Sequence, residues 1–323
     1  MIIDKKRISL WSKMGSRATF GLSLMDVVKE MEDLMVVTCD VSTSAGLDRF
    51  KKTYPENYID VGIAEQNMIG IATGISLFGN RVITTTFSPF QTLRCCEQIK
   101  NNLGYMNSNV KMVGLASGLV LGTLGFTHAS IEDIGALRSI PNMNIISPAD
   151  CTETVKSIYA SLNNDSPTYI RLTGGQLNNP VYEEDYNFEI GKAIRIKKGK
   201  EIAILASGTR VSDSVLASEK IYQEKNFQVS VYNFHTIKPI DKITIKEIVN
   251  DHDCLLTVEE HNIIGGLGSA VSEILAEMDK KNVKLYRMGV EDFYPKGSDY
   301  NSLLKLLNLD QDGIYNKIIK LLS

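Results

Sequence analysis

The chain reads Asp60-Val-Gly-Ile-Ala-Glu-Gln-Asn-Met-Ile-Gly-Ile-Ala-Thr-Gly-Ile-Ser76 where one pattern gives way to another. The β-branched and aromatic residues before Gly62 predict a strand that ends there. The apolar residues after it recur at the spacing of a helix face: Met68, Ile69, Ala72 and Ile75. We expect Gly70 and Gly74 to let another backbone approach this helix closely. The pattern predicts a strand, a tight turn and a packed helix.

A single carboxylate, Glu65, lies in the predicted first turn of this otherwise apolar helix. Two interpretations are open at this point. A carboxylate there can simply stabilise the helix, by about 0.3–1 kcal/mol, through a favourable interaction with the helix dipole. Alternatively, Glu65 is a buried acid that takes part in chemistry through a hydrogen bond or a shared proton.

Strand and helix patterns alternate along the whole chain. In the first half, strands are expected at 35–41, 81–87, 110–115, 143–146 and 168–172, with helices near 16–32, 64–78, 90–103, 129–139 and 150–162. A second alternation has strands at 202–206, 229–234, 255–258 and 284–288, and ends in an amphipathic helix at 313–322 that should pack on its own domain. The alternation predicts an α/β protein with two consecutive domains, each a mostly parallel sheet flanked by helices.

Aperiodic sequence rich in Gly, Asn and acidic residues separates the two alternations. We therefore expect a first domain over 1–175, a linker over 176–192 and a second domain over 193–323. A length of 323 residues is sufficient for two domains with separate cores.

Composition narrows the class of protein. Charged residues make up 23% and apolar ones 43%, as in globular proteins, and the net charge of -3 gives no electrostatic case for nucleic acid. The five cysteines show neither a disulfide framework nor zinc-ligand spacing. No apolar run is long enough to span a membrane, and no apolar run follows the basic N-terminal residues. We expect a cytoplasmic protein whose partners are small molecules or other proteins.

Further motifs follow the opening one in a fixed order. They are Thr86-Phe-Ser-Pro-Phe90, Gly125-Phe-Thr-His128, the run from Ile131 to Asp150, and Val258-Glu-Glu-His-Asn-Ile-Ile-Gly-Gly-Leu-Gly-Ser-Ala270. From about residue 10 to its end, the chain resembles the C-terminal half of transketolases. It looks like the shorter subunit of a split transketolase. More distantly, it is similar to the C-terminal parts of deoxyxylulose-phosphate synthase and the β subunit of 2-oxoacid dehydrogenase E1 components.

This resemblance implies thiamine diphosphate as cofactor. Glu65 matches the glutamate that hydrogen-bonds the aminopyrimidine ring, and Phe87 and Phe90 match the aromatic residues that hold that ring. Their spacing alone favours core packing of Phe87 and Phe90; the resemblance assigns them to the ring. Leu93 stands where transketolases often have a third aromatic residue, which implies a looser cage.

The resemblance also implies roles for other residues. His128 matches a histidine that contacts the sugar hydroxyls, although its position before a helix also suits a capping residue. Ile63 is assigned to the cofactor pocket, and Asp40 to the vicinity of the thiazolium. Ser44 and Arg17 match substrate-binding positions, with a solvated helix-face arginine as the alternative for Arg17.

Two departures from the family concern the substrate. Thr123-Leu124 stands between glycines where many transketolases have an acidic pair that reads hydroxyl configuration. Gly174-Gly175 replaces a phosphate-binding arginine after Tyr169-Ile-Arg171, although Arg171 could be aimed differently. The substrate is therefore expected to differ from the standard pentose phosphates.

The sequence lacks the Gly-Asp-Gly run, followed some two dozen residues later by Asn, that holds Mg²⁺ and the cofactor's diphosphate in the family. We expect a second subunit to carry these ligands, in an assembly such as a heterotetramer. Gly265-Gly-Leu-Gly268 is no substitute and is expected to let a helix start pack closely.

The predicted function is therefore transfer of a two-carbon ketol unit from a ketose donor to an aldehyde acceptor, by one subunit of a heteromeric, transketolase-like transferase. Two alternatives stay open. One is an E1 β subunit, which would act on a 2-oxoacid. The other is a non-catalytic scaffold or regulatory subunit, which the Thr123-Leu124 and Gly174 departures suggest.

Overall fold

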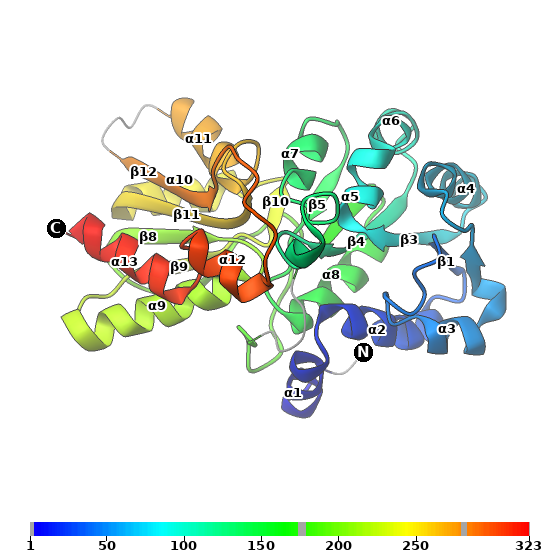
Figure 1. Cartoon of the computed structure of the whole chain (residues 1–323), viewed down its shortest axis with the longest axis horizontal. Coiled ribbons are helices and arrows are strands. Elements are labelled where there is room, and N and C mark those ends of the chain that lie inside the picture. Colours follow the sequence, from blue (N-terminus) through cyan, green and yellow to red (C-terminus); the bar gives the residue numbers. More distant parts are fainter. Residues whose placement is uncertain (1–2, 174–178, 279–282, 323) are drawn as a thin grey trace.

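Two mostly parallel sheets organise the chain, as the alternation predicts (Figure 1). The computed structural model describes residues 3–173, 179–278 and 283–322. The first sheet has the strand order β10-β5-β6-β4-β3-β1-β2. Its strands are β1 (Leu34–Thr38), β2 (Tyr58–Asp60), β3 (Arg81–Phe87), β4 (Val110–Ser117), β5 (Asn144–Ile146), β6 (Thr168–Thr173) and the antiparallel β10 (Thr236–Lys238). β-branched residues such as those of β3 suit strands whose two faces are both covered.

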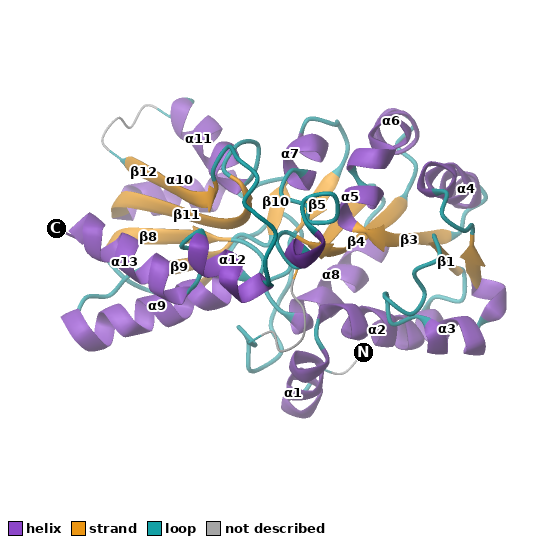
Figure 2. Cartoon of the chain, viewed as in Figure 1, coloured by secondary structure: helices purple, strands orange, loops and turns teal. Residues whose placement is uncertain are grey.

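Helices cover both faces of this sheet (Figure 2). On one face lie α4 (Glu65–Leu77), α5 (Ser88–Gln91), α6 (Cys96–Gln98) and α7 (Asp133–Arg138). On the other lie α2 (Ser16–Glu30), α3 (Asp48–Thr53) and α8 (Cys151–Leu162), with α1 (Lys5–Met14) packed on α2 and α8. Asp150 begins α8 by accepting a hydrogen bond from the Glu153 N–H at 2.8 Å, which satisfies one free donor of the first turn.

The second sheet has the order β12-β11-β8-β9-β7. Its strands are β7 (Ile194–Lys197), β8 (Glu201–Ala206), β9 (Ser230–Asn233), β11 (His252–Asn262) and β12 (Lys284–Val290), of which only the edge strand β7 pairs antiparallel. Its helices are α9 (Arg210–Lys225), α10 (Lys242–Asp251), α11 (Leu267–Ala276), α12 (Tyr300–Leu306) and α13 (Gln311–Leu322). The terminal helix α13 packs against α9, which confirms the expectation for the tail.

Two features of the fold differ from the sequence-based expectation. β10 lies beyond the expected linker but joins the first sheet beside β5, and buried residues of both halves form one continuous core. The helix expected at 90–103 is broken: α5 ends at Gln91, and Thr92 after it has φ -113° and ψ -79°. A 3₁₀ turn, η2 (Leu93–Cys95), then α6 and a π-helix, η3 (Ile99–Tyr105), follow it. Among the described residues, no helix is long and apolar enough to cross a membrane.

Candidate functional site

The candidate site lies where the parallel strands of the first sheet end. Asp40 follows β1, Glu65 follows β2 and Phe87 ends β3, and these three strands are neighbours in the sheet. Because the carboxyl ends of parallel strands share one edge, these residues gather at one side of the sheet. That edge is the usual ligand site of open α/β sheets.

Glu65 is buried at the first position of α4, with its side chain only 6% exposed. Its Oε1 accepts a hydrogen bond from Arg94 Nη1 at 2.7 Å. The thiols of Cys39 and Cys95 lie nearby. Burial, with a smaller contribution from the Glu65 charge, raises the pKa of Cys39 to about 11 and that of Cys95 to about 12. Both thiols are therefore neutral at pH 7 and add no charge beside Glu65.

Phe90 is the centre of a chain of ring contacts. Its centroid lies 6.4 Å from that of Phe87 and 5.3 Å from that of His128, both in edge-to-face geometry. The guanidinium carbon of Arg94 lies 4.0 Å from the Phe90 centroid. Arg94 therefore links Glu65 to the aromatic residues, and the structure brings Glu65, Phe87, Phe90 and His128 together.

Sequence reasoning missed Arg94. The available signal was its place four residues after Phe90 in the expected helix, although the structure breaks that helix at Thr92. Leu93, beside it, is 45% exposed and, as an aliphatic residue, supplies no third aromatic ring.

The remaining predicted residues lie at the same edge without a described contact to Glu65. Ile63 is 78% exposed, and Asp40 is exposed with a left-handed φ of 56° and its N–H donated to Asp60 Oδ1 at 2.9 Å. Ser44 is half-buried in the loop after β1, and Arg17 is half-buried at the start of α2. A Cβ added at Gly46 would lie 3.1 Å from the Arg17 carbonyl oxygen, so α2 begins against this loop.

The expectation for two glycines is wrong within the described chain. A Cβ built on Gly70 or Gly74 would meet no heavy atom within 4 Å, so neither glycine allows a close backbone approach here. Gly70 lies on the exposed face of α4. In contrast, a Cβ at Gly265 would lie 2.8 Å from Gly135 Cα, so close packing at the start of α11 is confirmed.

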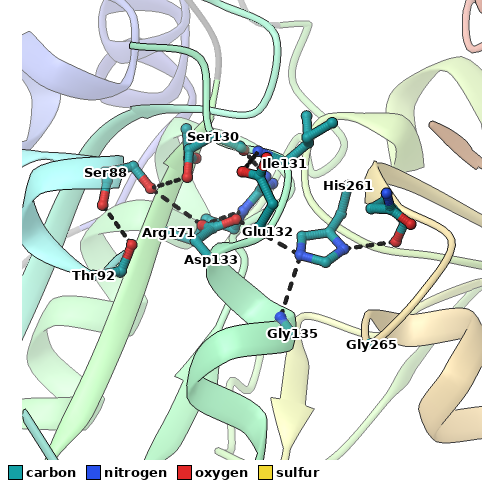
Figure 3. A network of polar contacts seen from close by, with 12 residues as sticks. Ser88, Thr92, Ser130, Ile131, Glu132, Asp133, Gly135, Arg171, His261 and Gly265 are labelled. Atoms are coloured by element: carbon teal, nitrogen blue, oxygen red, sulfur yellow. Dashed lines mark hydrogen bonds and ion pairs between the residues drawn. The ribbon is translucent and has the colours of Figure 1, made fainter. Parts of the chain in front are cut away.

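A buried polar network anchors the segments that carry Phe87, Phe90 and His128 (Figure 3). Asp133 Oδ2 accepts hydrogen bonds from Tyr169 Oη at 2.7 Å, Arg171 Nε at 2.7 Å and Ser88 Oγ at 3.2 Å. Ser88 also bonds Ser130 Oγ at 3.2 Å. Ser88 lies between the two phenylalanines, and Ser130 lies two residues after His128. One carboxylate therefore fixes both segments.

The second domain supports the same network. Arg171 Nη2 donates to the carbonyl of Glu260 at 2.8 Å. His261 Nε2 accepts the Gly135 N–H at 3.2 Å (Figure 3). Burial lowers the pKa of His261 to about 4, so the ring is neutral at pH 7. A neutral ring that accepts at Nε2 donates from Nδ1, here to Asn262 O at 2.7 Å. Arg171, 2% exposed, is thus a structural residue and faces no open substrate pocket.

Glu260 supports the loop that precedes His128. Its Oε1 accepts the Leu119 N–H at 2.8 Å, and its Oε2 accepts from Tyr300 Oη at 2.6 Å. The loop carries the exposed pair Thr123-Leu124, where the family often has acids. The other departure, Gly174-Gly175, lies outside the described residues.

A thiamine cofactor needs ligands for its metal and a place for its aminopyrimidine ring. Among the described residues, no group of three or more His, Cys, Asp or Glu side chains is placed to hold a metal ion. The aminopyrimidine half, however, fits the residues present. The flat, N–H-bearing guanidinium of Arg94 already lies between the Phe90 ring and the Glu65 carboxylate, so the two are spaced for a planar group of that kind.

Comparisons with known proteins agree with this arrangement. Residues 12–180 match the transketolase pyrimidine-binding domain, and residues 191–314 match the transketolase C-terminal domain. A putative transketolase C-terminal section from Methanocaldococcus jannaschii is 36% identical over 95% of this chain and 96% of its own length. One subunit of the apulose-4-phosphate transketolase from Actinobacillus succinogenes is 37% identical over 92% of this chain and 95% of its own length.

Among solved structures, a split-gene transketolase in the form of an inactive β4 tetramer superposes with a TM-score of 0.87. It is 30% identical and covers 95% of this chain and 98% of its own. A pyrimidine-binding domain of this family implies thiamine diphosphate as the cofactor. The chain belongs to the transketolase family and carries its pyrimidine-binding and C-terminal domains.

Proposed function

We propose that Glu65, Phe87 and Phe90 bind the aminopyrimidine half of thiamine diphosphate and that His128 serves the sugar substrate beside it. The observation that carries this proposal is the placement of a buried carboxylate opposite an aromatic face, with a flat N–H-bearing group fitting between them. When bound, the cofactor supplies the chemistry that carries a two-carbon ketol unit from a ketose to an aldehyde.

The residues of this chain then bind, orient and move protons. Glu65 hydrogen-bonds a ring nitrogen and shares its proton, in a site whose neighbouring thiols are neutral. Phe87 and Phe90 fix the ring plane. His128, half-buried against Phe90, exchanges protons with the sugar hydroxyls.

The other predicted residues complete the site at the same sheet edge. Asp40 and Ile63 contribute to the cofactor side, and Ser44 and Arg17 to the substrate side. These four residues are exposed or half-buried, which leaves them available for ligand contacts. Their assignment follows from family resemblance and from their position after β1 and β2 and at the start of α2.

A partner subunit would provide the Mg²⁺ ligands and grip the diphosphate, since Mg²⁺ requires hard oxygen ligands. Exposed apolar residues flank the cluster in sequence: Ile63 before Glu65, Leu93 beside Arg94 and Leu124 before His128. Exposed apolar surface of this kind suits a protein interface. A related tetramer of one kind of chain alone is described as inactive, which accords with a site that needs two kinds of chain. We propose a heterotetramer.

We propose a donor ketose whose hydroxyl groups are recognised without carboxylates from the 122–125 loop. Thr123 and Leu124 supply one hydroxyl and an apolar surface where carboxylates would accept hydrogen bonds. A relative is named for apulose 4-phosphate, which widens the candidates beyond the standard pentose phosphates. Mass spectrometry of products from panels of ketose donors and aldehyde acceptors would identify the pair.

Cofactor binding tests the proposal. Thiamine diphosphate and Mg²⁺ are titrated into this chain alone, and into the chain reconstituted with its partner, while the unfolding temperature is measured. We expect cofactor-dependent stabilisation only in the complex. No stabilisation in either sample would refute the proposal and leave a scaffold subunit. Decarboxylation of a 2-oxoacid by the complex would instead indicate an E1 enzyme.

A further inference from the structure

Arg94 contacts the two residues between which the proposed function puts the cofactor ring. Its Nη1 lies 2.7 Å from Glu65 Oε1, and its guanidinium carbon lies 4.0 Å from the Phe90 centroid. It thereby makes both contacts that an aminopyrimidine would make, a hydrogen bond to the carboxylate and a stack on the ring.

The backbone around Arg94 is fixed, whereas its side chain has room to move. The Arg94 carbonyl accepts from Gln66 Nε2 at 3.1 Å, and Cys95 Sγ donates to the Phe90 carbonyl at 3.2 Å. Cys95 is fully buried. The Arg94 side chain, however, is 44% exposed, so it can rotate toward solvent without any change in the loop.

The ion pair partners the Glu65 charge. Glu65 is a nearly buried carboxylate, and a buried charge without a partner is costly. Arg94 supplies the opposite charge. In the loaded enzyme the same guanidinium would compete with the cofactor ring for the Glu65 carboxylate.

We propose that Arg94 is a gate on the cofactor site: it holds the aminopyrimidine position in the cofactor-free protein and swings toward solvent when the ring binds between Glu65 and Phe90. This inference rests on the proposed function and adds its regulation. Cofactor affinity is then reduced by the free energy needed to break the Arg94 contacts with Glu65 and Phe90.

The test is the affinity of the reconstituted complex for thiamine diphosphate, measured calorimetrically at fixed Mg²⁺. We expect Arg94→Ala to tighten binding about tenfold, which corresponds to about 1.4 kcal/mol. Arg94→Lys keeps the charge but loses the stacking of the planar guanidinium on Phe90. Its affinity for thiamine diphosphate should lie between those of Arg94→Ala and wild type. The cofactor-free Arg94→Ala protein should meanwhile unfold at a lower temperature than wild type, because Glu65 loses its partner.

Arg81→Ala is the matched control. Arg81 pairs with Asp33 at 2.6 Å and is 39% exposed, close to the values for Arg94, but it lies at the opposite end of β3 from Phe87. The complex carrying Arg81→Ala should bind thiamine diphosphate with the same affinity as the wild-type complex. Equal or weaker binding by Arg94→Ala would overturn the gate and leave the proposed function standing. A wild-type complex that binds no cofactor would instead overturn the proposed function and this inference with it.

Discussion

Replacing Asp133 by Ala removes the carboxylate on which the site-bearing segments converge. Tyr169, Arg171 and Ser88 all donate to its Oδ2, and Asp133 and Arg171 are 0% and 2% exposed. The change leaves a buried guanidinium without its counter-ion. Breaking a buried pair from one side costs about 3–5 kcal/mol, so we expect a loss of that size in the free energy of unfolding.

Asp33→Ala provides the matched comparison. Asp33 also pairs with an arginine, Arg81, at 2.6 Å, but its side chain is 36% exposed. A solvated ion pair contributes about 0–1 kcal/mol. The two variants remove the same group from pairs of similar length and differ mainly in burial.

The chain's single tryptophan, Trp11, is buried against α8 in the first domain, so its fluorescence in a urea titration follows the domain that carries the site. The reasoning is refuted if the free energies of unfolding of Asp133→Ala and Asp33→Ala differ by less than about 1 kcal/mol. Burial opposes ionisation of Asp133, but Arg171 outweighs it and holds the pKa of that carboxyl below its ordinary value. The difference between the variants should therefore persist above about pH 4 and shrink as the pH falls further.

Two further predictions concern the support of the site. Burial lowers the pKa of His261 to about 4, so below about pH 6.5 the unfolded chain binds a proton that the folded chain does not. Between pH 7.5 and 5, the free energy of unfolding of wild type should therefore fall by roughly 2 kcal/mol more than that of His261→Gln. Equal losses in the two proteins would contradict this. Gly118→Ala should destabilise the fold by about 1–3 kcal/mol more than Gly62→Ala in urea titrations. The two glycines have similar φ, +72° and +69°, but only at Gly118 would the new Cβ meet Glu260, 2.3 Å from its Oε1. Equal losses in the two variants would rule out this clash.

Local patterns predicted most of the fold, because strand and helix periods are local properties of the sequence. The strand expected at 81–87 is β3 with the same bounds, and α4 and α8 begin within one residue of expectation. β10 was missed, since three residues carry no usable period and their pairing partner β5 lies some ninety residues earlier. The break at Thr92 was missed because the apolar pattern continues across it.

The candidate site was predictable only in part. Motifs and family resemblance named Glu65, Phe87, Phe90 and His128, and the structure brings these four together. Contacts between distant parts of the chain were beyond such reasoning. Arg94 meets Glu65 across 29 positions, and Arg171 turns inward to Asp133 across 38. Arg171 was considered for contact with a substrate phosphate because nothing in its local sequence shows which buried group pairs with it.

The most direct measurement is the rate of ketol transfer by the complex reconstituted with Glu65→Gln. Gln keeps the size of the side chain but cannot share a carboxyl proton, so the account predicts a rate about 10²–10⁴-fold below wild type. Glu56→Gln, an exposed carboxylate outside the cluster, should leave the rate unchanged. A Glu65→Gln complex that transfers ketol units at close to the wild-type rate would contradict the central claim.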